Sequence, residues 1–278
     1  MCILSIQSAV VAGHVGNSAS TFFLQRLGFP VWPVNTVMFS NHPAHGSHTG
    51  HVTPAEDLQA LIDGLDQRGL LARCTAILSG YLGDAKTGPI VLDAVRRVRA
   101  QNADAVYLCD PVIGDKGQIY VADGIADFFA AEGIAAADVV TPNIFEAAYL
   151  TGIAIQTPAD ALAAADQLHA GGPHIVVITG IETEDGIMTI CTAGGSAWQV
   201  TYPTIDAPGY GAGDLFAGLL LGRLLRQADP KTALEHAAAA THTAVRLAAA
   251  SGSADLPLIE EQDAILNPET IRPAICLR

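Results

Sequence analysis

Short apolar segments of the β-strand type alternate with segments of helical pattern along this chain, and that alternation limits the possible folds more than any other feature. The strand-like segments are nearly continuous runs of Val, Ile and Leu, which is typical of strands covered on both faces. We expect strands at residues 3–7, 31–38, 76–79, 105–109, 139–141 and 175–179. We expect helices at residues 17–27, 86–100, 215–225 and 232–249. This order predicts an α/β protein with a mostly parallel central sheet and helices on both faces.

Two further helices have recognisable starts. The sequences TPAE at 53–56 and TPAD at 157–160 combine a capping Thr with Pro at the first helical position, and the first of these helices should end near residue 68. Segments 186–191 and 197–202, joined through two adjacent glycines, predict a small antiparallel hairpin. Because no linker, charge run or repeat divides the sequence, we expect a single domain over residues 1–278.

The composition disfavours several classes of protein. Of the 278 residues 50% are hydrophobic and 15% charged, so the chain is too apolar to be disordered. No apolar run reaches the roughly 18 residues of a membrane span, and residues 1–5 lack the basic start of a signal peptide. A net charge of −14 disfavours binding to nucleic acid or to an anionic membrane. The five scattered cysteines are odd in number and predict reduced core residues, so we expect a cytoplasmic protein.

The most informative motif is the segment APGYGAGDLFAG at residues 207–218. Its glycines let backbone N–H groups approach an anion, and the helix that follows adds the positive end of its dipole. Asp214 in the first helical turn is placed to accept a proton from an attacking hydroxyl group. An anion site beside a carboxylate suits phosphoryl transfer to an alcohol, although a simple glycine turn with an ordinary helical Asp is the alternative.

Two more motifs follow expected strands. Asp110 and Asp115 lie in CDPVIGDKG at 109–117, and such a pair can hold Mg²⁺ beside phosphates, or can belong to a solvated turn. Asn143 and Glu146, in TPNIFE at 141–146, share a face of a helix start and could equally be its capping residues. Because the carboxyl ends of parallel strands meet at one edge, we expect a cleft there. The polar residues at these strand ends are Ser8, Gly80, Tyr81, Asp110, Thr141 to Glu146, Thr179 and Gly180.

The motifs DPVIGD, TPNxxE and GxGD, in this order, resemble those of the ribokinase-like superfamily. The N-terminal half narrows the resemblance to pyridoxal kinases through SIQS at 5–8, GHVGN at 13–17, WPVNTV at 32–37, FSNH at 39–42 and SGYLG at 79–83. The resemblance implies a ribokinase-like fold and phosphorylation of the 5′-hydroxymethyl group of pyridoxal, and often of pyridoxine and pyridoxamine, with MgATP. It also implies a monovalent cation such as K⁺ and a homodimer.

The resemblance further implies a role for each matching residue. Asp214 would be the catalytic base, and the backbone N–H groups of Gly211, Ala212 and Gly213 would stabilise the transferring phosphoryl group. Mg²⁺ and the phosphates would be organised by Asp110, Asp115 and Glu146, with help from Asn143, Thr141 and Thr179. Adenine would lie beside Tyr202, Pro203, Thr204 and Ile205. The vitamer would contact Ser8, Tyr81 and the loop that contains His42, Pro43 and Ala44.

That loop departs from the pattern of the family. Pro43 stands where a Thr is usual, and it offers neither a hydroxyl group nor a backbone N–H to the substrate. Lys116 is a candidate for supplying positive charge to the phosphates, because Thr179 stands where some relatives carry Lys. The histidines at 42, 45, 48 and 51 could bind a metal or belong to a solvated loop, and His42 or His45 could contact the substrate ring. A hydroxymethylpyrimidine-type kinase and a non-catalytic B6-vitamer-binding protein are the alternatives to a pyridoxal kinase.

Overall fold

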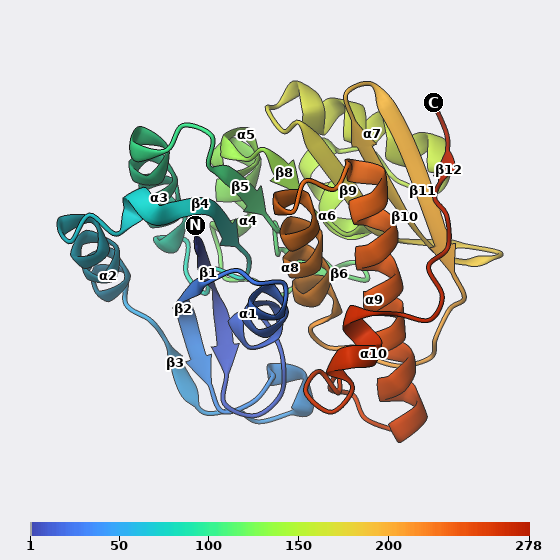
Figure 1. The fold of residues 1–278 in the computed structure, drawn as a ribbon, viewed down its shortest axis with the longest axis horizontal. Helices are drawn as coiled ribbons and strands as arrows, with labels where there is room; N and C mark the ends of the chain where they lie inside the picture. Colours follow the sequence, from blue (N-terminus) through green and yellow to red (C-terminus); the bar gives the residue numbers. More distant parts are fainter. Residues whose placement is uncertain (1) are drawn as a thin grey trace.

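The computed structural model describes residues 2–278 and is built around one ten-stranded sheet with the order β12-β11-β10-β9-β8-β5-β4-β1-β2-β3 (Figure 1). The strands are β1 (Cys2–Val10), β2 (Val31–Phe39), β3 (Gly50–Val52), β4 (Cys74–Ser79), β5 (Val106–Cys109), β8 (Val139–Val140), β9 (Ile175–Thr183), β10 (Gly186–Ala193), β11 (Ser196–Tyr202) and β12 (Ile275–Cys276). Strands β2, β1, β4, β5, β8 and β9 are parallel, and β3, β10, β11 and β12 run antiparallel to their neighbours. A separate two-stranded ribbon consists of β6 (Gly114–Asp115) and β7 (Gln118–Ile119).

Helices cover both faces of the sheet. One face is covered by α1 (Asn17–Arg26), α8 (Ala212–Leu225) and α9 (Pro230–Ser251), with the short α10 (Gln262–Leu266), and Figure 1 shows α8 and α9 side by side in front of the sheet. The other face is covered by α2 (Ala55–Gln67), α3 (Thr87–Gln101), α6 (Ile144–Thr151) and α7 (Pro158–Ala170). It also carries the consecutive turns α4 (Ile125–Phe128), η3 (Phe129–Gly133) and α5 (Ile134–Ala136). Two 3₁₀ turns complete the structure, η1 (Pro43–His45) and η2 (Leu71–Arg73).

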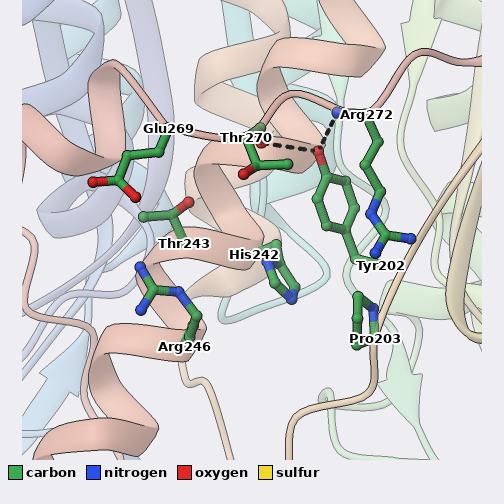
Figure 2. Close-up of a pocket in the computed structure, with 8 residues that line it drawn as sticks. All are labelled: Tyr202, Pro203, His242, Thr243, Arg246, Glu269, Thr270 and Arg272. Atoms are coloured by element: carbon green, nitrogen blue, oxygen red, sulfur yellow. Dashed lines mark hydrogen bonds between the residues drawn. The ribbon is translucent and has the colours of Figure 1, made fainter.

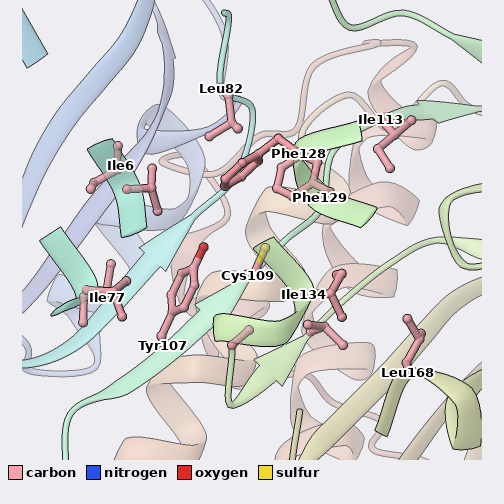
Figure 3. Close-up of a cluster of buried hydrophobic side chains, with 14 of the residues drawn as sticks. Ile6, Ile77, Leu82, Tyr107, Cys109, Ile113, Phe128, Phe129, Ile134 and Leu168 are labelled. Atoms are coloured by element: carbon pink, nitrogen blue, oxygen red, sulfur yellow. The ribbon is translucent and has the colours of Figure 1, made fainter. Parts of the chain in front are cut away.

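Successive strand residues therefore point into two different cores. In β1, Leu4 packs into one core and Ile3 into the other, as strand alternation requires. Figure 3 shows the first of these cores, where the rings of Phe128 and Phe129 lie among aliphatic side chains. Tyr107 is fully buried in it, and its hydroxyl group is hydrogen-bonded to that of Ser79 at 2.8 Å. Burial on both faces explains the continuous apolar runs of the sequence.

The fold class expected from the sequence is confirmed, with three differences in detail. The predicted hairpin forms as β10 and β11, but it extends the main sheet through β9 instead of standing apart. The TPAD start is confirmed as a capping box at Thr157, whereas the capping of α2 by Thr53 is wrong. The hydroxyl group of Thr53 donates to the carbonyl oxygen of Asn35 instead. The short ribbon β6–β7 was not expected, because each of its strands has only two residues.

Four of the five cysteines are buried and all five are free, in agreement with their assignment as reduced residues. Among residues 2–278, none of the helices combines the length and the hydropathy that a membrane crossing requires.

The order in which the chain adds strands to the sheet reverses between β1 and β4. From β1 the chain passes to β2 on one side through α1, and it later returns to β4 on the other side of β1 through α2 on the opposite face. Ligands of open α/β sheets bind beyond the carboxyl ends of strands at such a reversal. The fold therefore points to the ends of β1 and β4 as the place of a ligand site.

The crossing of α1 and α8 gives a test of the fold. A Cβ atom at Gly218 in α8 would lie 2.8 Å from the Cβ atom of Ser20 in α1, so we expect Gly218→Ala to lower the free energy of unfolding by about 1–3 kcal/mol. Gly64 in α2 faces open space, and Gly64→Ala should raise the free energy of unfolding by about 0.5–1 kcal/mol. Urea unfolding of both variants measures the two changes, and a shift of equal sign would contradict this packing.

Candidate active site

The glycine loop before α8 rests directly on the loop that follows β1. Gly211 precedes the helix with φ +85°, and a Cβ atom there would lie 2.0 Å from the carbonyl oxygen of His14. Only glycine allows both the backbone conformation and this approach. Three residues later, Asp214 occupies the first turn of α8. The two loops therefore place Asp214 beside the end of β1.

Gly16 links Asp214 to Ser8. Its backbone N–H lies near the Asp214 carboxylate and opposes part of the rise in the pKa of that group, and a Cβ atom on Gly16 would lie 2.4 Å from the Ser8 hydroxyl oxygen. Ser8 belongs to β1 itself, at the point where the pairing with β2 becomes irregular, and not to the loop after it as the sequence suggested. Although Asp214 keeps some exposed surface, its carboxyl group lies within the protein, and this burial raises its pKa to about 6.

Asp110 lies at the end of β5 and close to Asp214. It is buried, and its carboxylate accepts a hydrogen bond of 2.8 Å from the hydroxyl group of Thr141. Burial, followed by the charge of Asp214, raises the pKa of Asp110 to about 7. Two neighbouring carboxylates in a buried site repel one another, and a divalent cation would relieve the repulsion. The donor set therefore suits a hard cation with oxygen ligands.

Glu146 and Asn143 fix the segment that carries Asp110. The Glu146 carboxylate accepts hydrogen bonds from the N–H groups of Ile113 and Asn143, both at 2.9 Å. The Asn143 side chain caps α6 and also donates to the carbonyl oxygen of Gly114 at 2.8 Å. The capping alternative for this motif is thus present in the structure. Both oxygens of Glu146 are engaged, so the residue holds the DPVIGD segment against α6, while burial and Asp110 raise its pKa to about 8.

The structure does not gather the three expected metal ligands into a cluster. Asp115 lies exposed in the β6–β7 ribbon, where it accepts a hydrogen bond from the N–H of Lys116, itself exposed. Within residues 2–278, no three His, Cys, Asp or Glu side chains converge as a metal site, and this includes the histidines of loop 42–51. A Mg²⁺ ion that shares its ligands with water and phosphate needs only one or two carboxylates.

One of the three expected anion-binding amides is already engaged. The N–H of Ala212 donates to the carbonyl oxygen of Gly209 at 3.0 Å. Because of this hydrogen bond, the N–H of Ala212 is not free to bind an anion. The N–H groups of Gly211 and Gly213 have no backbone acceptor in loops or turns of the described chain, and they remain for an anion.

Tyr120 was missed by the sequence analysis. It follows β7, is 56% exposed, and its pKa is raised by partial burial and then by the charges of Glu146, Asp110, Asp214 and Asp115. The Tyr120 side chain therefore lies near the acidic site. The glycine turn at 116–117, which folds the chain back on itself, was the only signal for it in the sequence.

A cavity of about 290 Å³ lies where the base of a nucleotide was expected. Figure 2 shows its walls, which are Tyr202 at the end of β11, Pro203 directly after it, His242, Thr243 and Arg246 from α9, and Glu269, Thr270 and Arg272 from the C-terminal segment. The Tyr202 ring stacks on His242 with 4.6 Å between centroids, whereas Thr204 and Ile205 do not line the cavity. Because Val245 of α9 packs against Gly209, one helix carries both the cavity and the glycine loop.

The remaining candidates for contacts with the vitamer and the phosphates come from three further segments. Tyr81 follows β4, and its carbonyl oxygen accepts a hydrogen bond from Thr36. Thr179 lies in β9, where its N–H donates to the carbonyl oxygen of Pro142. His42 precedes η1, which contains Pro43 and Ala44, and stacks on Tyr210 of the glycine loop at 4.6 Å. Tyr210 was not among the expected site residues.

The comparisons with known proteins agree with this architecture. The family model described as phosphomethylpyrimidine kinase matches residues 36–258. A pyridoxal kinase PdxY of Rubrobacter xylanophilus is 42% identical over 96% of this chain and 94% of its own length. A pyridoxal kinase PdxY of Pseudomonas aeruginosa is 41% identical over 99% and 98% of the two chains.

A solved structure, the pyridoxal kinase of Leishmania donovani in complex with ADP and ginkgotoxin, is similar with a TM-score of 0.94 and 28% identity over 99% of both chains. The same enzyme in complex with ADP and pyridoxamine gives a TM-score of 0.93 at the same identity and coverage. Full-length similarity in sequence and fold shows that this chain belongs to the pyridoxal kinase family of the ribokinase-like superfamily.

Proposed function

We propose that this protein transfers a phosphoryl group from ATP to the 5′-hydroxymethyl group of pyridoxal and related B6 vitamers. The observation that carries the proposal is the position of Asp214, in the first turn of α8, beside the free amides of the glycine loop and next to Ser8 through Gly16. A proton acceptor, an anion site and a substrate-side hydroxyl group thus meet at one point. The pyridoxal kinase relatives and the ADP complexes of the Leishmania enzyme support this choice of donor and acceptor.

Asp214 acts on the hydroxyl group of the vitamer. Its carboxylate orients that group and accepts its proton as the oxygen attacks the γ-phosphorus, while the bond from that phosphorus to the β,γ-bridging oxygen breaks and ADP leaves. The amides of Gly211 and Gly213, together with the N-terminal end of α8, stabilise the negative charge of the transferring group. The nearby backbone N–H of Gly16 favours the ionised form of the Asp214 carboxylate before the substrate binds.

Asp110 and Asp115 are the proposed metal-side residues. Mg²⁺, when bound there with the nucleotide, would neutralise part of the phosphate charge. Glu146 and Asn143 hold the DPVIGD segment in place, and Thr141 orients the Asp110 carboxylate. Thr179, in β9, would contact the phosphates.

The base and the vitamer have separate subsites in this proposal. Adenine occupies the cavity beside Tyr202 and Pro203, on a loop that continues through Thr204 and Ile205. The vitamer lies between Ser8, Tyr81 and the loop with His42, Pro43 and Ala44. We further propose a single domain, a homodimer, a requirement for a monovalent cation such as K⁺, and a cytoplasmic location, for which the resemblance to the family is the support.

A hydroxymethylpyrimidine is the second candidate substrate. It is a flat heteroaromatic alcohol, the matching family model bears the name of a phosphomethylpyrimidine kinase, and Pro43 cannot donate a hydrogen bond to a vitamer. The deciding experiment incubates the protein with ATP, Mg²⁺ and each of pyridoxal, pyridoxine, pyridoxamine and hydroxymethylpyrimidine, and identifies the products by mass. Turnover of the pyrimidine alone would overturn the assignment, and tight binding of pyridoxal without turnover would indicate a binding protein.

Asp214 gives the first catalytic prediction. Asp214→Asn removes the proton acceptor, and we expect kcat to fall by about 10²–10⁴-fold while circular dichroism shows an unchanged fold. Since the carboxylate must be ionised, kcat/KM of the parent protein should fall as the pH drops through about 6, the raised pKa of Asp214. Near-parental turnover of the variant would exclude Asp214 as the base.

Substitution of Asp110 should make the protein more stable and less active. The pKa of Asp110 is raised by folding, so the folded state binds the extra proton between about pH 4 and 7 and loses stability as the pH rises through that range. Asp110→Asn keeps an acceptor for Thr141 but removes the buried charge. We expect it to raise the free energy of unfolding at pH 8 by an amount on the order of 1–3 kcal/mol, with little gain near pH 4.

The same variant should require more Mg²⁺ for half-maximal activity. Urea unfolding at the two pH values and a Mg²⁺ titration measure both effects. A stability gain that does not depend on pH would show that the charge of Asp110 is not its origin.

A further inference from the structure

Four side chains join the candidate substrate loop to the rest of the protein, and we call them the clasp: His42, His45, Tyr210 and Asp255. The His42 ring stacks on Tyr210 with 4.6 Å between centroids and 24° between planes. The His45 ring meets the same Tyr210 edge-on at 5.3 Å, and its Nε2 lies 3.0 Å from Oδ1 of Asp255. Within residues 2–278, every aromatic or ionic contact that leaves loop 42–46 ends on Tyr210 or Asp255.

The two anchors of the clasp are tied to each other and to the catalytic loop. The backbone N–H of Tyr210 donates to the carbonyl oxygen of Ala254, and Tyr210 and Asp255 form an isolated parallel bridge. Tyr210 directly precedes Gly211, which rests on His14. The position of loop 42–46 is therefore set by the same backbone that carries the amides and Asp214.

The contacts of the clasp are weak enough to open. The side chains of His45 and Asp255 are 32% and 38% exposed, so solvent screens their interaction. The other hydrogen bonds of this loop are local, such as those from the Asn41 side chain to the carbonyl oxygens of His42 and Ser47. A substrate can thus enter when the clasp is open and be covered when it closes.

We propose that Tyr210, His45 and Asp255 are positioning residues, which hold loop 42–46 closed over the ring of the vitamer. This inference rests on the proposed function and deepens it. Pro43 and Ala44 offer the substrate neither a hydroxyl group nor, at Pro43, a backbone N–H, so ordering of the loop must come from elsewhere. The clasp supplies it from side chains that need not touch the substrate.

A positioning role predicts a specific kinetic change. If only the closed loop binds the vitamer well, its apparent affinity falls in proportion to the closed fraction. We expect KM for pyridoxal to rise about two- to fivefold in His45→Ala and about five- to tenfold in Tyr210→Ala. KM for ATP should stay within about twofold, because the clasp contacts none of the residues that line the base cavity.

Conservative and double variants separate positioning from general damage. Tyr210→Phe keeps the ring and Asp255→Asn keeps a hydrogen-bond partner, so each should raise KM for pyridoxal less than the corresponding alanine variant. The double variant His45→Ala/Asp255→Ala should equal the stronger single variant, since both remove one interaction. His51→Ala is the matched control, because His51 is exposed on nearby β3 and lies outside the clasp.

Hydrogen exchange tests the clasp without any substrate. In the ligand-free full-length protein, peptides covering residues 40–49 should exchange faster in His45→Ala and Tyr210→Ala than in the parent, and at the parental rate in His51→Ala. Unchanged exchange, or equal rises in KM for pyridoxal and ATP, would overturn the inference. If exchange is faster in the variants but the parent protein phosphorylates another alcohol instead of a B6 vitamer, the clasp is supported and only the choice of substrate is refuted.

Discussion

The close approach of two loops is the contact on which the site depends. Gly211 lies against the carbonyl oxygen of His14, and the N–H of Gly16 reaches back to the carboxylate of Asp214. This contact makes neighbours of the loop after β1 and the first turn of α8, although some 200 residues separate them in the chain. A side chain at Gly16 or Gly211 would push the loops apart, so two glycines set the distance between the candidate base and the candidate substrate side.

The acidity of the site follows from the same crowding. Asp110, Glu146 and Asp214 lie within one region of low solvent access, and all three have raised pKa values. In the ligand-free protein the carboxylates destabilise one another, as functional groups commonly do. A divalent cation bound together with the nucleotide would relieve that repulsion. The net charge of −14 is therefore compatible with an anionic substrate, because local groups decide the potential at the site.

The sequence predicted the elements whose signals are local, and it missed those that depend on distant partners. The parallel sheet, the glycine loop and the strand-end carboxylates follow from runs of residues that lie together in the chain. The hydrogen bond between Ala212 and Gly209, the hydrogen bonds from amides of another segment to Glu146, and the proximity of Tyr120 to the acidic residues do not. Each depends on which groups the tertiary fold brings together, and the periodicity and spacing of the sequence carry no information about those contacts.

The loop around Pro43 shows how a departure in sequence can be balanced in structure. A loop without a hydroxyl group loses one direct substrate contact, and its position then depends more on what holds it from outside. His42 and His45 supply that hold through Tyr210 and Asp255, which lie 165 and more residues further along the chain. Tyr210 also begins the turn that presents Gly211. Because Tyr210 lies outside the residues that line the base cavity, the position of the loop bears on the vitamer side of the site and leaves the contacts with the base unchanged.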